Sequence, residues 1–456
     1  YGLGIISSNY PDQVIATRKG SPLVIGIGEN GNYIASDQLA LLSVTNKFIF
    51  LEEEDIAEIK LDKVNIFDQN GEKVERQIIT SKIKAGQVDI GTYDHFMQKE
   101  IFEQPQAIRD TLESRITNDS VITSSFGYRA DKIFKNTRQV QIVACGTSYN
   151  AGLVAKYWIE DIAKIQCSVE VASEYRYRRP ILSDNTLFVT LSQSGETADT
   201  LEALKAAKKI NNTVKSLCIS NTPESSLTRL SDLTFLTHAG PEIGVASTKA
   251  FTTQLVSLAL LLCSIGKLQN NINSKQEKEI VDGLKKLPGL INEALLQEAQ
   301  IKELAIRFID KNSALFLGRG SMHAIAMEGA LKLKEISYIH AEAYPAGELK
   351  HGPIALIDKK MPVIAIAPND ELLEKLKSNL QEVKSRGSQM IVFEDENSNI
   401  QPMDAMEVIP ITSNLGRITA PIIFTIPLQL LSYHVALIKC TNVDKPRNLA
   451  KSVTVE

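Results

Sequence analysis

The stretches QVQIVACGTS, residues 139–148, and LFVTLSQSGET, residues 187–197, decide the fold. In each, a short and uninterrupted apolar run passes into a glycine-containing turn, and a helical stretch follows. Apolar runs of this length without alternation are typical of strands covered on both faces in a parallel sheet. The sequence therefore predicts a doubly wound α/β fold from about residue 138 onward.

The same order of strand and turn recurs further along the chain. Ala314–Leu317 runs into Gly318-Arg319-Gly320-Ser321, and Pro362–Ile366 runs into Ala367-Pro368-Asn369. The turns at 146 and 318 lie 172 residues apart, and those at 192 and 367 lie 175 apart. This nearly constant offset predicts a tandem duplication.

Hydroxyl side chains distinguish the first copy of the repeat from the second. Ser192, Ser194 and Thr197 occupy one turn of the first copy, and Thr147 and Ser148 follow what we expect to be the neighbouring strand. Backbone N–H groups and the helix dipole at such a turn attract anions, and the hydroxyls add donors. An isolated pair of serines would more often cap a helix. The run of polar residues favours a binding site for a phosphate monoester.

The first 80 residues differ from the rest in pattern. Ser21–Gly28, Asn32–Ala35 and Lys47–Leu51 are short β-rich segments separated by Gly, Asn and Asp, which predicts a β-dominated unit. Tyr93–Glu103 has helical character, so we expect it to lead into the second region. The boundary is predicted near residue 90.

Composition narrows the class of protein. Of 456 residues 43% are hydrophobic and 23% charged, which excludes a disordered or fibrous chain. Fifty basic and 54 acidic residues give a net charge of −4 without a basic tract, so we expect neither nucleic-acid nor membrane binding. The apolar stretches 250–265 and 421–439 are interpreted as buried core helices.

The cysteines indicate the redox compartment. Five of them, widely spaced in apolar surroundings, are typical of reduced core thiols and favour a cytoplasmic location. No cluster with metal-ligand spacing is apparent, and the pairs Gly26/Gly28 and Gly318/Gly320 are too short for a dinucleotide fingerprint. We therefore expect no cofactor: neither NAD, pyridoxal phosphate nor zinc.

Six runs resemble the family of glutamine–fructose-6-phosphate aminotransferases: CGTSYN (145–150), SQSGETADT (192–200), GVASTKAFTTQ (244–254), EGALKLKEISYIH (328–340), AYPAGELKHGP (343–353) and KPRNLAKSVTVE (445–456). The resemblance covers essentially the whole chain. It implies two tandem SIS (sugar isomerase) domains, preceded by a β-rich remnant of an Ntn-type glutaminase domain. The implied activity is the synthesis of glucosamine 6-phosphate from fructose 6-phosphate and glutamine, with ammonia passed from the glutaminase to the isomerase.

The implied domains are the C-terminal part of the glutaminase (1–88), a linker helix (89–110), two SIS domains (111–290 and 291–440) and a catalytic tail (441–456). The family's glutaminase uses an N-terminal cysteine nucleophile and an Arg–Trp glutamine-binding region, and this sequence begins downstream of both. We therefore expect this chain to retain only the isomerase half-reaction, with glutamine binding supplied by the missing N-terminal part.

The resemblance also assigns catalytic roles. Lys451 forms an imine with C2 of the open sugar, Glu335 moves the C1 proton to C2, and Lys332 lies close to the substrate. From the residues alone, Lys451 would be a solvated tail lysine, and Glu328, Lys332 and Glu335 would form one solvated helix face. Lys445 and Arg447 are expected to help keep Lys451 neutral if the tail folds over the site.

His351 lies between Gly347 and Pro353, in what we predict to be a loop rather than a helix or strand. The resemblance assigns it to opening of the sugar ring and implies that its loop comes from the partner subunit of a homodimer. The substrate-binding residues implied by the resemblance are Thr147, Ser148, Ser192, Gln193, Ser194, Thr197, Val245, Ser247, Arg447 and Ala450; a metal ion is not expected.

Two other functions would also use the phosphate-binding turn. A non-catalytic phosphosugar sensor would not need Lys451, Glu335 or His351. A deglycase acting on amine-modified sugars would not need this C-terminal tail. The sensor does not explain the glutaminase-like residues 1 to 88, and it does not need the C-terminal tail either.

Overall fold

The computed structural model describes residues 1–81 and 89–454, residue 39 by its backbone alone. The chain divides into two compact units. One comprises Tyr1–Gly91 with the short segments Glu196–Leu201 and Ser452–Glu456, and the other comprises Thr92–Gly195 and Glu202–Lys451. Part of the domain boundary predicted near residue 90, residues 82–88, lies outside the described residues.

The N-terminal unit contains two antiparallel sheets, as the short β-rich segments predict. One sheet has the order β1-β2-β6-β7-β8, and the other has the order β4-β3-β5-β9. Ala16, Ile25, Ile49, Ala57 and Ile59 belong to a small buried cluster drawn from both sheets. The strands are β1 Gly2–Ser7, β2 Tyr10–Arg18, β3 Val24–Gly28, β4 Gly31–Ala35, β5 Lys47–Phe50, β6 Ile56–Lys60, β7 Val64–Phe67, β8 Lys73–Val74 and β9 Ile78–Thr80.

The larger unit contains two parallel sheets of five strands each. The first has the order β11-β10-β12-β13-β14 and the second the order β16-β15-β17-β18-β19, so each follows the pattern 2-1-3-4-5. This shared topology confirms the predicted duplication and the doubly wound fold. The strands are β10 Gln139–Ala144, β11 Gln166–Val171, β12 Thr186–Ser192, β13 Lys215–Ser220 and β14 Leu233–Leu236, then β15 Ser313–Gly318, β16 His340–Pro345, β17 Pro362–Ala367, β18 Gln389–Glu394 and β19 Met406–Pro410.

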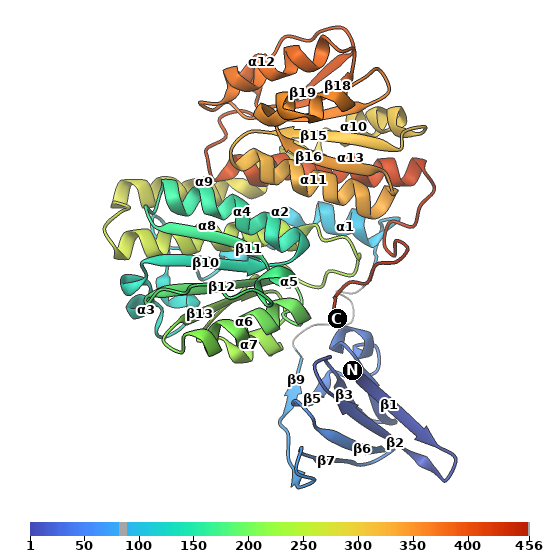
Figure 1. Ribbon diagram of the computed structural model, residues 1–456. Helices are drawn as coiled ribbons and strands as arrows, with labels where there is room; N and C mark the ends of the chain where they lie inside the picture. The colour runs from blue at the N-terminus through green and yellow to red at the C-terminus, as the bar shows by residue number, and fades with distance from the viewer. Residues whose placement is uncertain (82–88, 455–456) are drawn as a thin grey trace. The chain divides into compact units, whose positions relative to one another are not determined.

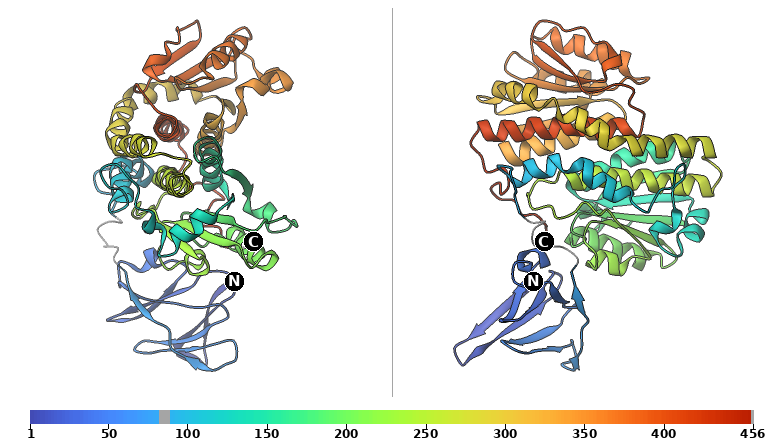
Figure 2. Two further views of the ribbon diagram at one scale, coloured as in Figure 1. Left: turned by 90° about the vertical axis from the view of Figure 1, so that its left-hand side faces the viewer. Right: turned by 180° about the vertical axis from the view of Figure 1, so that it is seen from behind.

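Helices cover both faces of each parallel sheet, and helices of the two SIS-like halves pack against one another between the sheets (Figures 1 and 2). In the first half α4 and α8 lie on one face while α6 and α7 lie on the other (Figure 1). The helices are α1 Phe96–Phe102, α2 Gln104–Leu112, α3 Ala130–Asn136, α4 Gly146–Asp161, α5 Ala172–Tyr175, α6 Ala198–Ile210, α7 Ser226–Leu230, α8 Lys249–Leu268, α9 Ser274–Leu295, α10 Glu298–Ala305, α11 Ser321–Ser337, α12 Leu373–Lys384 and α13 Thr419–Ile438.

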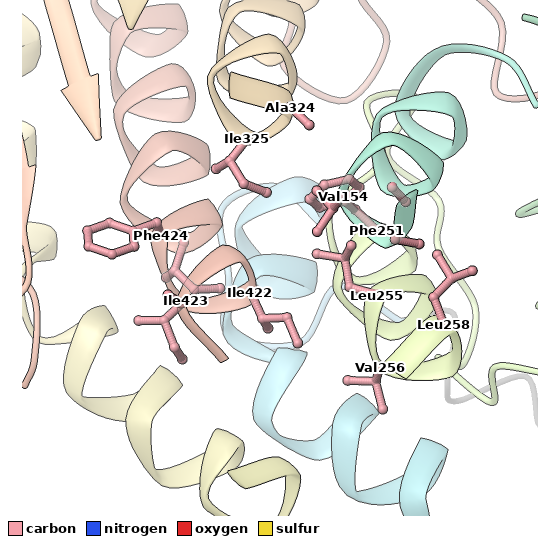
Figure 3. Packing of buried hydrophobic residues seen from close by; sticks show 14 of the residues in the cluster. Val154, Phe251, Leu255, Val256, Leu258, Ala324, Ile325, Ile422, Ile423 and Phe424 are labelled. Carbon is pink, nitrogen blue, oxygen red and sulfur yellow. The ribbon is translucent and has the colours of Figure 1, made fainter. Parts of the chain in front are cut away.

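The core of the larger unit lies where α4 and α8 meet α11 and α13 (Figure 3). Phe251 and Leu255 of α8 are fully buried there, as are Ile325 of α11 and Phe424 of α13. Helices α8 and α13 are long and apolar enough to cross a membrane by length and composition, but 89% of each apolar window is buried inside the protein. Both are core helices, as predicted.

Helix α9 runs without interruption from Ser274 to Leu295, so the predicted division between residues 290 and 291 falls inside it. The expectation of five core thiols is only partly correct. Cys167, Cys218 and Cys263 are buried, whereas Cys145 is half-buried and Cys440 is exposed at the end of α13.

Candidate active site

The carboxyl ends of β10 and β12 lie side by side at one edge of the first parallel sheet. These strands pair in parallel up to Val143 opposite Thr190, and each leads into a helix. Thr147 and Ser148 occupy the first turn of α4, and Ser192 is the last residue of β12. The predicted proximity of the two hydroxyl-bearing turns is therefore confirmed. The carboxyl edge of such a sheet is where α/β proteins bind ligands.

The turn after β12 is held by a side-chain hydrogen bond within the turn and by a backbone bond to the segment after β13. The Ser192 hydroxyl accepts a hydrogen bond from the Gly195 N–H at 3.0 Å, and the Gln193 carbonyl accepts one from the Asn221 N–H at 3.1 Å. Gly195 has φ +68°, and a Cβ there would lie 1.9 Å from Oγ of Ser225, so only glycine fits. Ser192 and Ser194 are buried, while Thr197 is half-buried immediately before α6.

On the adjacent turn, Thr147 connects the two SIS-like halves. Its hydroxyl donates to Oε1 of Glu328 at 3.0 Å and accepts from Nζ of Lys332 at 3.0 Å. Asn150 donates to the other oxygen of Glu328 at 2.8 Å. Helix α11, from the second half of the repeat, is thereby fixed to α4 of the first. The neighbouring Ser148 hydroxyl accepts from Nε2 of Gln254 at 3.0 Å.

Glu328, Lys332 and Glu335 lie on one face of α11, as their spacing predicts. Lys332 is 3.4 Å from Glu328 and 2.7 Å from Glu335, and its side chain is 1% exposed. The interpretation of this face as solvated is therefore wrong for Glu328 and Lys332. Only Glu335 retains access to solvent, with 22% of its side chain exposed.

Burial and charge oppose one another within this cluster. Burial alone would lower the pKa of Lys332, but Glu328, Glu335 and Glu242 raise it above its ordinary value. Burial raises the pKa of Glu328 despite the nearby ammonium of Lys332. Lys332 is thus a fixed cation beside the partly exposed carboxylate of Glu335. Such a pair can bind an anionic oxygen and exchange a proton at the same place.

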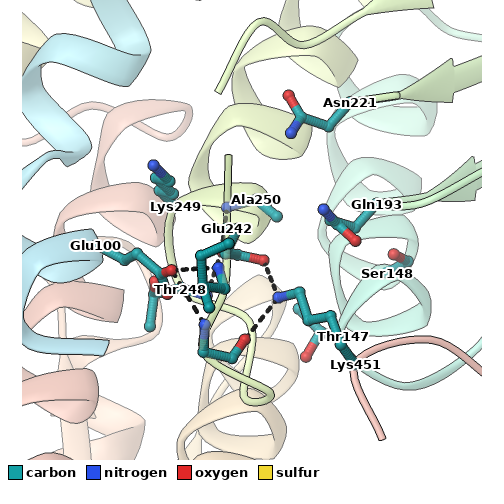
Figure 4. A network of polar contacts seen from close by, with 12 residues as sticks. Glu100, Thr147, Ser148, Gln193, Asn221, Glu242, Thr248, Lys249, Ala250 and Lys451 are labelled. Carbon is teal, nitrogen blue, oxygen red and sulfur yellow. Dashed lines mark hydrogen bonds and ion pairs between the residues drawn. The ribbon is translucent and has the colours of Figure 1, made fainter. Parts of the chain in front are cut away.

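Lys451, in the C-terminal tail, reaches into the larger unit. Its Nζ donates to Oε2 of Glu242 at 2.5 Å and to the Gly244 carbonyl at 2.8 Å (Figure 4). The interpretation of Lys451 as a solvated tail residue is therefore wrong. Lys445 and Arg447, which we expect to help keep Lys451 neutral, are both exposed, and Arg447 stacks over the ring of Tyr338, 4.2 Å from its centroid. The partner of Lys451 is a carboxylate.

Glu242 is held ionised by its surroundings. Its other oxygen accepts hydrogen bonds from the N–H groups of Thr248 and Ala250 at the start of α8, at 2.9 and 3.0 Å. Burial alone would raise the pKa of Glu242, but the ion pair with Lys451 and these two N–H donors lower it below its ordinary value. The dipole of α8 favours the same charge.

A second buried carboxylate lies behind this pair. Glu100 of α1 accepts hydrogen bonds from the N–H groups of Ile243 and Gly244, at 2.5 and 3.1 Å. Burial, reinforced by the negative charge of Glu242, raises the pKa of Glu100 to about 7. Glu100 and Glu242 were not among the predicted site residues. Glu242 lies two positions before the run 244–254, one of those that carry the family resemblance, whereas nothing in the sequence marks Glu100.

The remaining predicted residues are more dispersed. Val245 and Ser247 are half-buried in the segment after Gly244, and Val245 donates its N–H to the Asp444 carbonyl at 3.0 Å. Ala450 is exposed. His351 ends the short 3-10 helix Ala346–His351 rather than lying in an irregular loop, so that local prediction is wrong. Its side chain is exposed, and within the described part of the chain no hydrogen bond or ion pair involves its ring.

Within the described residues, no group of three or more His, Cys, Asp or Glu side chains is arranged to hold a metal ion.

The two parallel sheets coincide with two matches to one domain family. The SIS domain family matches residues 133–264 and 307–439. The chain is 57% identical over 456 residues to glutamine–fructose-6-phosphate aminotransferase [isomerizing] of Pseudomonas putida, covering 100% of this chain and 74% of that protein. The corresponding enzyme of Escherichia coli K12 is 56% identical with the same coverage.

Solved structures are also similar to this chain. The C-terminal domain of glucosamine-fructose-6-phosphate aminotransferase from Francisella tularensis has a TM-score of 0.76 and 53% identity, covering 78% of this chain and 99% of that one. A glucosamine-6-phosphate deaminase from Thermotoga maritima has a TM-score of 0.61 and 25% identity, covering 79% and 99%.

Two parallel sheets with a hydroxyl-lined turn at the carboxyl edge of the first define a protein with tandem SIS domains. Within that class, the chain belongs to the family of glutamine–fructose-6-phosphate aminotransferases (isomerizing), which are enzymes.

Proposed function

We propose that this chain carries out the isomerase part of glucosamine 6-phosphate synthesis, converting fructose 6-phosphate with ammonia as the nitrogen source. One observation carries the proposal: Nζ of Lys451 is bound by the buried Glu242 carboxylate and by the Gly244 carbonyl. The Lys451 amine is thereby held at a fixed place in the protein, from which it can react with a bound sugar. The sugar phosphate fits the hydroxyl-lined turn at 192–197, where backbone N–H groups and a helix start favour an anion.

The proposed reaction starts when Lys451 leaves its ion pair and loses a proton. Its amine then condenses with the C2 ketone of the open-chain sugar, forming an imine and releasing water. Ammonia adds to the imine carbon and displaces the Lys451 amine, so that C2 now carries the nitrogen of ammonia. Glu335 removes the proton from C1 and returns it to C2 while the C1 hydroxyl gives up its proton, which leaves an aldehyde at C1 and an amine at C2. Lys332, 2.7 Å from Glu335, orients that carboxylate and stabilises negative charge developing on the sugar oxygen at C1.

His351 is proposed to act on the site of a second copy of the chain. Ring opening needs a group that exchanges protons near neutral pH, and histidine has the suitable ordinary pKa. The exposed position of His351 at the end of a short helix is compatible with insertion into a partner subunit. The proposal therefore includes a homodimer with shared sites.

Glutamine is the proposed source of ammonia in the complete reaction. We assign residues 1–88 to the C-terminal part of a glutaminase domain and 89–110 to a linker. Residues 111–290 and 291–440 are assigned to the two SIS domains, with helix α9 spanning the division between them, and 441–456 to a catalytic tail. The antiparallel sheets of the N-terminal unit are compatible with the first assignment. A cytoplasmic location is proposed from the buried thiols of Cys167, Cys218 and Cys263.

The proposal is tested by incubating the purified chain with fructose 6-phosphate in D₂O and following glucose 6-phosphate by NMR. We expect isomerisation without added glutamine, because the opening and proton-transfer groups lie in the SIS domains and the tail. Borohydride added during turnover should trap one sugar per chain on Lys451, located by peptide mass spectrometry. A chain that binds the sugar phosphate but neither isomerises nor traps it would be the non-catalytic sensor instead.

A further inference from the structure

Glu100 is a buried carboxylate outside the predicted catalytic set. Its residue is 2% exposed, and its Oε1 accepts both the Ile243 and the Gly244 N–H. Its Oε2 is buried and has no hydrogen-bond partner within the described part of the chain. Burying a carboxylate oxygen without a hydrogen-bond partner is energetically unfavourable. The position of Glu100 therefore indicates a structural or functional role.

The segment that Glu100 binds is the one that receives Lys451. Glu242 provides the carboxylate for Nζ of Lys451, and Gly244 provides the carbonyl. The two N–H groups bonded to Glu100 lie between those two acceptors in the chain. Rotation of the Ile243–Gly244 segment would therefore redirect the Gly244 carbonyl away from Nζ.

Helix α1 also binds the beginning of the tail. The Asp444 carboxylate accepts from the N–H groups of Phe96 and Met97, both at 2.9 Å. One short helix thus contacts the tail before Lys451 through its first turn, and the segment that receives Lys451 through Glu100. Glu103, which caps the end of α1, pairs with Lys249 of α8 at 2.7 Å, which ties the end of this helix to the start of α8.

We propose that Glu100 is a positioning residue for Lys451: it fixes the Ile243–Gly244 segment so that the Glu242 carboxylate and the Gly244 carbonyl hold the Lys451 amine in place for reaction with the sugar. This inference rests on the proposed function, because it assigns the reacting amine to Lys451. Glu100 acts through this segment and does not touch substrate.

The glycine at 244 fits this role. A Cβ at Gly244 would lie 2.9 Å from Oε2 of Glu100, closer than a carbon and a carboxylate oxygen tolerate. Any side chain at 244 would therefore push the segment away from Glu100. Residues 100 and 244 can accordingly be tested as a pair, because removing the carboxylate removes the collision.

The experiment measures steady-state isomerisation and borohydride trapping with the full chain. Glu100→Ala should lower kcat and the trapping rate by about tenfold or more, since small displacements of a reacting group are costly. KM for fructose 6-phosphate should stay within about threefold, because the phosphate turn is untouched. Glu100→Gln should recover most of the activity, because the amide oxygen can accept the same two N–H bonds. Glu113→Ala, at an exposed carboxylate after α2, is the control expected to behave as the wild type.

Gly244→Ala provides a second perturbation in case Glu100→Ala does not fold. Alone it should lower kcat as Glu100→Ala does, and in the Glu100→Ala background it should add little, because the two changes act at one contact. The inference is overturned if Glu100→Ala and Gly244→Ala both trap sugar at the wild-type rate. It is also overturned if Glu100→Gln is as impaired as Glu100→Ala. A wild-type chain that neither isomerises nor traps would instead refute the proposed function itself.

Discussion

Nζ of Lys451 lies 2.5 Å from Oε2 of Glu242, whose side chain is completely buried. The two residues are 209 positions apart in sequence. Their contact binds the tail to the segment that leads into α8. Because a buried carboxylate left without its cation is strongly destabilised, this pair holds the tail in place as well as the amine. In the proposed reaction this contact opens before Lys451 forms the imine, so the proposal couples stability of the tail to chemistry.

Lys451→Arg should abolish covalent trapping of fructose 6-phosphate. A guanidinium keeps the positive charge opposite Glu242 but does not lose its proton to form an imine. The measurement is the intact mass of the chain after borohydride treatment with the sugar, with Lys445→Arg, at an exposed tail lysine, as the matched control. A sugar adduct of normal yield on Lys451→Arg would exclude Lys451 as the imine-forming residue.

Ser192→Ala combined with Ser194→Ala should weaken binding of fructose 6-phosphate. Each charge-assisted hydrogen bond lost is worth about 1.5–3 kcal/mol, or roughly tenfold to a hundredfold in Kd. Isothermal titration calorimetry measures the change, and binding of unphosphorylated fructose should remain weak throughout. Asn369→Ala, in the equivalent turn of the second SIS domain, should leave the affinity unchanged. If only Asn369→Ala weakened binding, the phosphate site would belong to the second domain.

Glu335→Gln should bind sugar phosphate but lose proton transfer between C1 and C2. An amide does not act as a base, so the rate of exchange at C1 should fall by on the order of 10²–10⁴. Deuterium incorporation from D₂O, followed by NMR, measures the exchange directly. Imine trapping on Lys451 should persist in this variant. Exchange at the wild-type rate would assign the base to another residue.

Mixed dimers should show whether His351 acts across subunits. His351→Asn and Lys451→Arg should each be inactive alone. After subunit exchange, a heterodimer would contain one site with both native residues, and activity should reappear at up to about half of the wild-type value per mixed dimer. Exchange is verified by native mass spectrometry. Continued inactivity of proven heterodimers would indicate that each site is built within one chain.

Glu100 should make stability depend on pH. Burial raises the pKa of Glu100 from 4.5 to about 7, so the folded chain keeps a proton that the unfolded chain releases. The stabilisation is fully present below pH 4.5 and is lost as pH rises through 7. Relative to Glu100→Gln, the wild type should therefore lose on the order of 3 kcal/mol of unfolding free energy between pH 5 and pH 8. Urea denaturation at both pH values measures this difference, and parallel pH profiles for the two proteins would contradict it.

The parallel sheets could be predicted because their signals are local. An uninterrupted apolar run such as Gln139–Ala144 specifies a strand covered on both faces, and the following glycine turn specifies where the helix starts. The constant offset between the copies predicts two equivalent sheets, which their shared strand order confirms. The hydroxyls at Thr147 and Ser192 could be placed at one edge for the same reason, since parallel neighbouring strands end together.

The charged cluster could be predicted only in part. Spacing on α11 places Glu328, Lys332 and Glu335 on one face, but it predicts a solvated face, because a helical pattern does not reveal what packs against it. Thr147 and Asn150 of α4 cover that face and bury the ion pair. The 3-10 helix ending at His351 was missed because Gly352 and Pro353 favour an irregular loop.

The sequence by itself determined the strands, the turns and the residue types available for chemistry, because these depend on near neighbours in the chain. It also determined the duplication, because the same local patterns recur at offsets of 172 and 175 residues. Tertiary structure alone decided the partners of Lys451 and the partners of Glu100. Contacts between α1, the segment 242–244 and the tail join residues more than 140 positions apart. Burial against such distant segments converts ordinary surface residue types into a paired, water-poor site, and no local pattern records it.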